Sequence, residues 1–296
     1  MPPQMAVLRY LQLDVFAPRP GTGNPLGVVL EADRLSSSQM QALAAWLNLS
    51  ETVFFLRPSA PGADYHIRIF TPTCELAFAG HPSVGAAWAA VTCGLVQPRD
   101  GALLQQCAAG LLPVRVSGPA GALEIQLASP PARRLATTAD AAPTALLALA
   151  AEGHAPELWD NGARWWLLPL RDAAAVRSLV PGMEALRDWS IATDATGLAV
   201  FADDTGPGHD RVVRAFCPAD APGVPEDPVT GSANALIGAW LRQRNALPAG
   251  DHGNYIASQG REVGRDGQVQ VSVDAQGTVW IGGQVQPVIE GHIRWP

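Results

Sequence analysis

The sequence of 296 residues contains no lysine, because all 20 of its basic residues are arginine. This absence excludes enzymes that need an amine at a fixed point, namely Schiff-base lysine enzymes, pyridoxal-phosphate enzymes and P-loop phosphate-binding proteins. Charged residues of any kind are scarce, at 16% of the chain, and the formal net charge is −7. Since nucleic-acid-binding surfaces are basic, we expect no nucleic-acid partner.

Cysteine is also rare, and the four cysteines form no Cys-x-x-Cys pair. The six histidines share no ligand spacing with one another or with acidic residues, so we expect neither a metal site nor a redox dithiol. No apolar run approaches the roughly 20 residues that a membrane span needs, and the N-terminus shows no basic segment followed by an apolar core. These features predict a cytoplasmic protein without a membrane partner.

The length favours two domains, at about 150 residues per domain. Hydrophobic residues make up 48% of the chain, and the glycines and prolines lie between apolar runs, which is typical of an ordered globular protein. The Ser129-Pro130-Pro131 break marks the expected boundary. We therefore predict an N-terminal domain over 1–128, completed by a strand near 284–296, and a C-terminal domain over 129–283.

Hydrophobic periodicity alternates between strand and helix signals, which predicts an α/β (α+β) fold. The expected strands include Val7–Phe16, Leu26–Leu30, Thr52–Leu56, Asp64–Phe70, Leu112–Val116, Ala122–Leu127, Trp165–Leu170 and Gly197–Phe201. The expected helices follow the capping box Ser36/Gln39, begin near Pro82 and after Thr230, and cover Ala139–Ala151 and a stretch near Asp172–Leu179.

A faint internal repeat connects the two halves of the chain. The string R-I-F-T-P (68–72) is followed by A-G-H-P-S-V-G-A-A-W (79–88), and R-A-F-C-P (214–218) is followed by T-G-S-A-N-A-L-I-G-A-W (230–240). In each copy a strand ends in Arg-x-Phe-x-Pro, and a turn containing glycine then opens an amphipathic helix. The repeat predicts two similarly built domains with the functional site in the cleft between them.

The two repeated turns, Gly80-His81 and Gly231-Ser232, are candidate anion-binding sites. The first amides of a helix have no intrahelical partner, and a glycine lets a ligand approach the backbone closely. Two such helix starts could hold a substrate carboxylate. The alternative is that His81 and Ser232 are ordinary helix caps.

Three side chains are candidates for acid–base chemistry. Glu51 follows a helix end and precedes an apolar strand. Neighbouring groups there could raise the pKa of its carboxylate, as a general base at neutral pH requires. His81 could donate a proton, anchor a hydrogen bond or cap its helix. Asp227 lies in Glu226-Asp227-Pro228, shortly before the second turn. Taken alone, Glu51 and Asp227 could equally be a solvated glutamate and a loop acid.

Several strings together resemble the PhzF-like phenazine-biosynthesis family. They are D-V-F-A (14–17), G-N-P-L-G-V-V-L (23–30), N-L-S-E-T-V-F-F (48–55), R-I-F-T-P-T-C-E-L-A-F-A-G-H-P (68–82), E-D-P-V-T-G-S-A-N (226–234) and Q-G-R (259–261). The resemblance implies a diaminopimelate epimerase-like fold, in which two domains each wrap a curled mixed sheet around a central helix. It also implies that no cofactor is needed, and it favours a homodimer paired through a sheet edge.

The resemblance also assigns roles to individual residues. It implies that Glu51 is the catalytic glutamate, that His81 and Asp227 are cleft residues, and that Gly80, Gly231 and Ser232 lie on substrate-holding turns.

The chemistry follows from two missing thiols. An epimerase of this fold has cysteines just before the two turn glycines, whereas this chain has Ala79 and Thr230. One carboxylate can remove a proton from one carbon and return it to another on the same face, which shifts a double bond. We therefore expect a cofactor-independent isomerase of a small, cyclic, carboxylate-bearing substrate. The alternatives are an epimerase or racemase that uses Glu51 and Asp227, and a non-catalytic small-molecule-binding protein.

Overall fold

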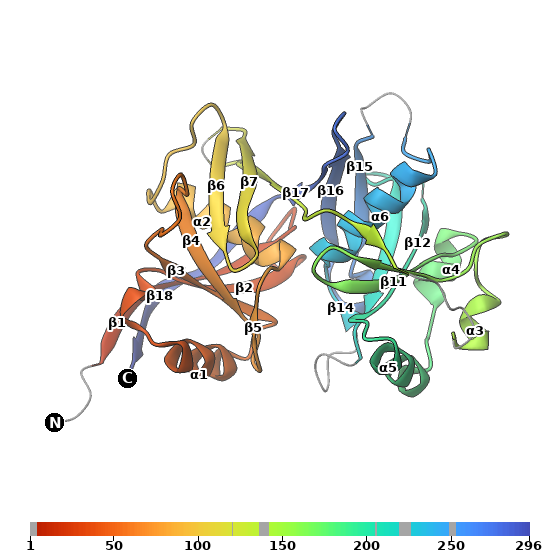
Figure 1. Ribbon diagram of the computed structural model, residues 1–296, viewed down its shortest axis with the longest axis horizontal. Helices are drawn as coiled ribbons and strands as arrows, with labels where there is room; N and C mark the ends of the chain where they lie inside the picture. Colours follow the sequence, from red (N-terminus) through yellow and green to blue (C-terminus); the bar gives the residue numbers. More distant parts are fainter. Residues whose placement is uncertain (1–4, 120, 136–141, 205, 219–225, 249–252) are drawn as a thin grey trace. The chain divides into compact units, whose positions relative to one another are not determined.

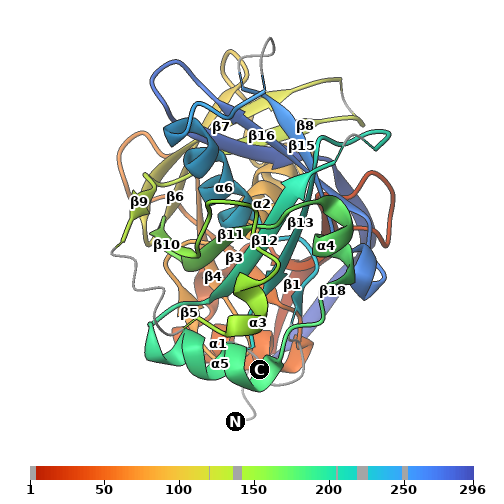
Figure 2. The same cartoon turned by 90° about the vertical axis from the view of Figure 1, so that its right-hand side faces the viewer.

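The computed structural model describes residues 5–119, 121–135, 142–204, 206–218, 226–248 and 253–296. The chain divides into two compact units (Figures 1 and 2). Unit 1 comprises Met1–Ala128 and Gly282–Pro296, and unit 2 comprises Ser129–Ile281. The cleft expected from the sequence stays a prediction.

Unit 1 contains a mixed sheet in the order β18-β1-β2-β3-β4-β6-β7-β8. Only the β2/β3 and β4/β6 pairings are parallel. The short strand β5 adds to β4, antiparallel. The strands are β1 (Ala6–Val15), β2 (Asn24–Val29), β3 (Glu51–Leu56), β4 (Tyr65–Phe70), β5 (Glu75–Leu76), β6 (Ala102–Cys107), β7 (Gly110–Ser117), β8 (Glu124–Ala128) and β18 (Val285–Trp295).

Helix α2 (Gly80–Thr92) is the centre of unit 1. Every residue from Gly80 to Ala90 is buried, which is typical of a helix enclosed on all sides. The helix contacts β1, β2, β3, β4, β8 and β18, so the sheet curls around it. Figure 1 shows α2 among these strands.

Helix α1 (Ser37–Leu47) packs on the same unit through Met40, Leu43 and Ala44. The predicted capping box is confirmed, because the Ser36 side chain accepts a hydrogen bond from the Gln39 amide and the Gln39 side chain accepts one from the Ser36 amide. The helix ends at Asn48, which adopts a left-handed conformation and directs the chain into β3.

Unit 2 repeats this arrangement of strands. Its sheet runs β9-β10-β11-β12-β13-β15-β16, with β14 added to β13, and only the β11/β12 and β13/β15 pairings are parallel. The strands are β9 (Arg133–Arg134), β10 (Glu157–Asp160), β11 (Arg164–Pro169), β12 (Gly197–Asp203), β13 (Arg211–Phe216), β14 (Glu226–Asp227), β15 (Tyr255–Gln259), β16 (Gly267–Val273) and β17 (Val279–Gly283), which crosses the unit boundary.

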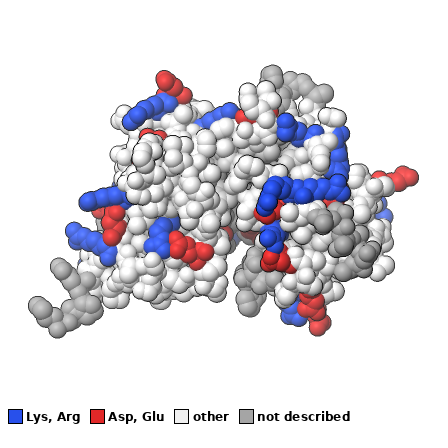
Figure 3. All heavy atoms as spheres, in the orientation of Figure 1, with Lys and Arg blue, Asp and Glu red and all other residues white. Residues whose placement is uncertain are grey.

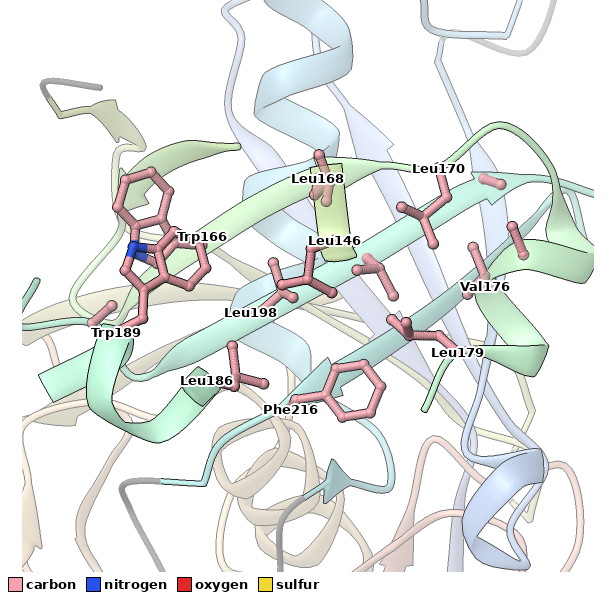
Figure 4. Close-up of a cluster of buried hydrophobic side chains, with 14 of the residues drawn as sticks. Leu146, Trp166, Leu168, Leu170, Val176, Leu179, Leu186, Trp189, Leu198 and Phe216 are labelled. Carbon is pink, nitrogen blue, oxygen red and sulfur yellow. The ribbon is translucent and has the colours of Figure 1, made fainter. Parts of the chain in front are cut away.

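Helix α6 (Gly231–Gln243) corresponds to α2, because each helix follows a two-residue return strand. The amphipathic helix predicted after Thr230 is confirmed, and its buried residues include Ala233, Leu236, Ile237, Trp240 and Leu241. Helix α4 (Ala173–Ser178) packs on β12 and β13, and helix α5 (Met183–Ala192) packs on β12. Figure 4 shows the apolar cluster that they share with these strands.

The predicted helix over Ala139–Ala151 is confirmed only in part among the described residues. Residues 139–141 lie outside the described residues, and the helical part is only α3 (Thr144–Leu147). Ala150 instead bridges to Leu170, and the Ala151 amide donates to the carbonyl of Pro169. These backbone contacts with the end of β11 override the helix propensity of an Ala- and Leu-rich segment. Helix α5 was not expected from the sequence.

Candidate functional site

Glu51 and His81 lie together in unit 1. Glu51 is the first residue of β3 and pairs with Leu26 of β2, while His81 is in the first turn of α2. The His81 Nε2 atom is 3.4 Å from the Glu51 Oε2 atom. The side chains are 5% and 17% exposed, so the pair is largely removed from water. The structure thus brings together two of the three acid–base candidates.

The His81 ring is buried in its neutral form. Burial lowers the pKa of the imidazole to about 3, and a hydrogen bond to the Pro25 backbone opposes this shift in part. Proline has no amide hydrogen, so the Pro25 carbonyl accepts this bond and a ring N–H donates it. Because Nε2 faces Glu51, we assign the donor as Nδ1 and infer that Nε2 carries a lone pair.

This tautomer leaves a place for one proton between the two side chains. A lone pair on His81 Nε2 and a carboxylate oxygen of Glu51 are both acceptors, so their approach at 3.4 Å is favourable when a proton lies between them. The Glu51 carboxyl group can supply that proton after it has taken one from elsewhere. The pair is therefore arranged to accept a proton and hold it.

Asp14 fixes the loop that leads to Pro25. Its Oδ2 atom accepts the backbone amides of Gly21, Thr22 and Gly23 at 2.7, 2.9 and 3.1 Å. Asp14 itself is only 3% exposed. Three such bonds to one charged oxygen hold the turn tightly.

Helix α2 begins without a side-chain cap. Its N-cap residue is Ala79, which has no side chain that could accept a hydrogen bond, so His81 does not cap the helix. The amides of Gly80 and His81 belong to the group that an α-helix leaves without an intrahelical partner. This helix start therefore keeps the donors that an anion would need.

Asp227 lies in unit 2, on the return strand β14 beside Ala215 of β13. Its Oδ2 atom accepts a hydrogen bond of 2.7 Å from the Thr230 hydroxyl, and its carbonyl accepts one of 3.0 Å from Gln259 Nε2. The side chain is thus held close to the start of α6.

Helix α6 likewise begins without a side-chain cap, because its N-cap residue Thr230 makes no such bond. Ser232 does not cap it either, since its hydroxyl accepts a 3.0 Å hydrogen bond from Trp165 Nε1. The Ser232 carbonyl accepts from Asn161 Nδ2 at 3.1 Å. These two bonds hold Ser232 in place. Its contact with a substrate stays a prediction.

Gln259 is a site residue that the sequence reasoning missed. Its Oε1 atom accepts from the Thr230 amide at 3.1 Å and from Asn234 Nδ2 at 2.9 Å, and its Nε2 atom donates to the Thr230 hydroxyl at 3.0 Å. The string Q-G-R at 259–261 was a signal for it, but nothing in the string indicates that the amide reaches the start of α6.

The two halves of the repeat differ at the acidic positions. The strand register makes Gly197 the counterpart of Glu51, because Thr52 pairs with Phe70 and Leu198 pairs with Phe216. A Cβ atom on Gly197 would lie 1.8 Å from the Phe216 carbonyl oxygen, so this position has no room for a side chain. Similarly, Leu76 occupies in unit 1 the place that Asp227 has in unit 2. Each unit therefore carries its acidic residue at a position where the other unit has a non-acidic one.

In the part of the chain that the structure describes, no three His, Cys, Asp or Glu side chains are grouped as metal ligands. None of the helices among the described residues is long and apolar enough to span a bilayer. On the face shown in Figure 3, basic and acidic side chains are interspersed, and much of the surface carries neither.

The chain is similar to known proteins over most of its length. The family model described as phenazine biosynthesis-like protein matches residues 13–291. The chain is 35% identical over 274 residues to a trans-2,3-dihydro-3-hydroxyanthranilate isomerase of Pseudomonas aeruginosa, covering 91% of each chain. It is 32% identical over 293 residues to the Schizosaccharomyces pombe protein named antisense-enhancing sequence 1, covering 95% of this chain and 97% of that protein.

A solved structure gives the same result for the fold. The phenazine biosynthesis protein of the PhzF family from Bacillus anthracis superposes with a TM-score of 0.81 at 25% identity, covering 98% of this chain and 99% of the other. The predicted diaminopimelate epimerase-like fold is confirmed, and the protein is an isomerase. The chain belongs to the phenazine biosynthesis-like protein family, which confirms the resemblance seen in its sequence.

Proposed function

We propose that the protein is a cofactor-independent isomerase that moves a proton on a small, cyclic, carboxylate-bearing substrate, with Glu51 as the general acid and base. The observation that carries this proposal is the buried contact between Glu51 and a neutral His81, at 3.4 Å. A carboxylate beside a proton acceptor of this kind is suited to take a proton and to return it.

The reaction follows from that pair. Glu51 removes a proton from one substrate carbon, and the electron pair of the broken C–H bond shifts the double bond. His81 Nε2 accepts a hydrogen bond from the newly protonated carboxyl group and so stabilises it. Glu51 then returns the proton to a different carbon on the same face. One C–H bond breaks and another forms, so no oxidant or reductant is consumed.

The turns at the two helix starts hold the substrate in this proposal. The amides of Gly80 and His81, and those at Gly231 and Ser232, are donors suited to a carboxylate. Asp227 serves the same reaction as a second polar group. Its hydrogen bonds to Thr230 and Gln259 support this role, because they fix the carboxylate rather than leave it to move in solvent.

A two-base epimerase is the second candidate. It would use Glu51 and Asp227 on opposite faces of one carbon. The replacement of both thiol positions by Ala79 and Thr230, and the different placement of the two acids within their units, favour the single-base isomerase. A non-catalytic binding protein is disfavoured, because a glutamate near a bound carboxylate would repel it.

The substrate can be sought among compounds close to that of the P. aeruginosa relative, whose printed name specifies trans-2,3-dihydro-3-hydroxyanthranilate. We expect one compound of this chemical class to be isomerised in deuterated water with less than one deuterium incorporated per product molecule, since Glu51 can return the proton that it removed. Product analysis by NMR and mass spectrometry tests this. Full incorporation with inversion at a single carbon would instead identify the epimerase.

The protein's assembly is proposed to be a homodimer formed through β18. Val288 and Ile289 on this strand are 52% and 50% exposed. The Arg9 carbonyl accepts the Leu30 amide, so it points toward β2, and the polar backbone groups of its partner His292 point away from β1. Such groups can pair with a second copy of the strand. Sedimentation at micromolar concentration should give a particle of about 62 kDa, twice the chain mass, whereas 31.1 kDa alone would contradict the dimer.

We further propose that the chain folds as two domains. One is formed by residues 1–128 together with 284–296, and the other by residues 129–283. Limited proteolysis should then cut first near 129–131, and cleavage spread evenly along the chain would contradict it. The cytoplasmic location stays a prediction.

A further inference from the structure

An arginine–glutamate ion pair occurs at the same place in both units and precedes each helix start. In unit 1 the Arg68 guanidinium binds both carboxylate oxygens of Glu75, at 2.7 and 2.6 Å. In unit 2 the Arg214 guanidinium binds both oxygens of Glu226, at 2.9 and 2.7 Å. Each arginine is the first residue of an Arg-x-Phe-x-Pro string, and each glutamate stands five residues before the helix-start glycine.

The pair in unit 2 is the more deeply buried and the more completely bonded. Arg214 and Glu226 are 8% and 6% exposed, compared with 22% and 35% for the pair in unit 1. The Arg214 Nη1 atom also contacts three carbonyls at the end of α4, the shortest bond being 2.6 Å to Leu179. The guanidinium lies over the Phe216 ring, 4.8 Å from its centroid. Arg214 is therefore a fixed point in the unit.

Glu226 connects Arg214 to the candidate residue Asp227. It is joined to Asp227 by one peptide bond, and the two residues are all of strand β14. We propose that the Arg214–Glu226 pair is a positioning pair that sets the place of Asp227 and of the turn that follows it. This inference rests on the proposed function for the role of Asp227, and it extends that function to residues that touch no substrate.

Stability alone is a poor explanation of the pair. Replacing a buried ion pair by apolar residues of similar volume is often neutral or stabilising, because the charges no longer have to be removed from water. A pair that only held the unit together could thus be replaced by apolar side chains. A pair that sets the direction of β14 could not, because apolar contacts lack the geometry of two parallel N–H···O bonds.

The test compares two double variants of the same unit. Arg214→Met/Glu226→Leu removes the positioning pair, and Arg244→Met/Glu157→Leu removes another partly buried pair at the far end of α6. Hydrogen exchange measured by mass spectrometry on the full chain should show residues 227–231 exchanging at least about tenfold faster in the first variant only. Strand β1 of unit 1, which contains none of the substituted residues, is the internal reference and should be unchanged in both. Equal exchange at 227–231 in the two variants would overturn the proposal.

Kinetics supplies a second readout. With a turned-over substrate, Arg214→Met/Glu226→Leu should lower kcat by about 10²-fold, the size expected for a misplaced group, with a smaller change in KM. In an Asp227→Asn background the same change should cost less than about tenfold, because the group it positions is already disabled. Multiplicative losses in that background would contradict positioning through Asp227.

The two readouts separate this inference from the proposed function. If Asp227→Asn leaves turnover unchanged, the role of Asp227 fails while the exchange result still decides the placement of β14. Should the first double variant not fold, Arg214→Lys keeps the charge but loses the bidentate geometry. It should also speed exchange at 227–231 by at least about tenfold, and wild-type exchange in this variant would overturn the proposal.

Discussion

The buried His81 makes a prediction that needs no substrate. Replacing it by Asn keeps a side-chain N–H near the position of Nδ1, so the hydrogen bond to the Pro25 carbonyl can persist. The substitution removes the titrating ring. Any pH dependence of stability that the variant lacks can therefore be assigned to that ring, and to its burial in the neutral form.

The sign and size of the effect follow from the two pKa values. The pKa of His81 is about 3 in the folded protein and ordinarily 6.5, so the unfolded chain binds the extra proton between these values. Stability is therefore full above about pH 6.5 and falls as the pH drops toward 3. The full slope is about 1.4 kcal/mol per pH unit, but the imidazole of the unfolded chain is only half protonated at pH 6.5. His81 should therefore remove about 2 kcal/mol from the free energy of unfolding between pH 6.5 and pH 4.5.

Urea unfolding at pH 7.5, 6.5, 5.5 and 4.5 measures this directly. The wild-type chain should lose about 2 kcal/mol more than His81→Asn over the lower two units. The matched control is His66→Asn on β4, because this histidine lies outside the proposed dimer strand, and the effect assigned to His81 is the difference between the two variants. Equal slopes for His81→Asn and the wild type would refute the burial of a neutral imidazole.

Two further predictions concern the hydrogen bonds around the candidate site. Thr230→Val keeps the shape of the side chain but removes both bonds of its hydroxyl, the 2.7 Å bond to Asp227 and the 3.0 Å bond from Gln259. It should lower kcat by about tenfold, which steady-state kinetics measures, and an unchanged kcat would contradict a role for these bonds. Asp14→Asn weakens three bonds to the turn before Pro25 and should cost about 2 kcal/mol of unfolding free energy. Urea denaturation at pH 7.5 is the assay, and a loss below about 0.5 kcal/mol would show that the charge on Asp14 is not needed.

Much of the fold was readable because local signals agreed with the final packing. The capping box at Ser36 and Gln39, and the strong apolar periodicity after Thr230, each predict a helix that the structure contains. The Ala- and Leu-rich stretch after 139 gave an equally strong local signal, but among the described residues its helix covers only Thr144–Leu147. There the backbone at Ala150 and Ala151 bonds to the end of β11, a contact that no local pattern contains.

The candidate site was readable in part for a similar reason. Glu51 and His81 are 30 positions apart, and each was a candidate from its own local context and from the family resemblance. Only the parallel pairing of β2 and β3 and the burial of α2 explain their approach. Gln259 and Arg214 act through the bonds they make at a distance in sequence. The repeated Arg-x-Phe-x-Pro string contained the arginine, yet its glutamate partner lies beyond a loop of different length in each copy.

The central claim is that the Glu51 carboxyl group moves the proton, and the kcat of Glu51→Gln tests it most directly. The substitution preserves the shape of the side chain but removes its ability to take a proton. With a substrate that the wild type isomerises, kcat should fall by about 10²–10⁴-fold, while calorimetry shows substrate binding and urea unfolding shows stability close to the wild type. Turnover at the wild-type rate by Glu51→Gln would contradict the account.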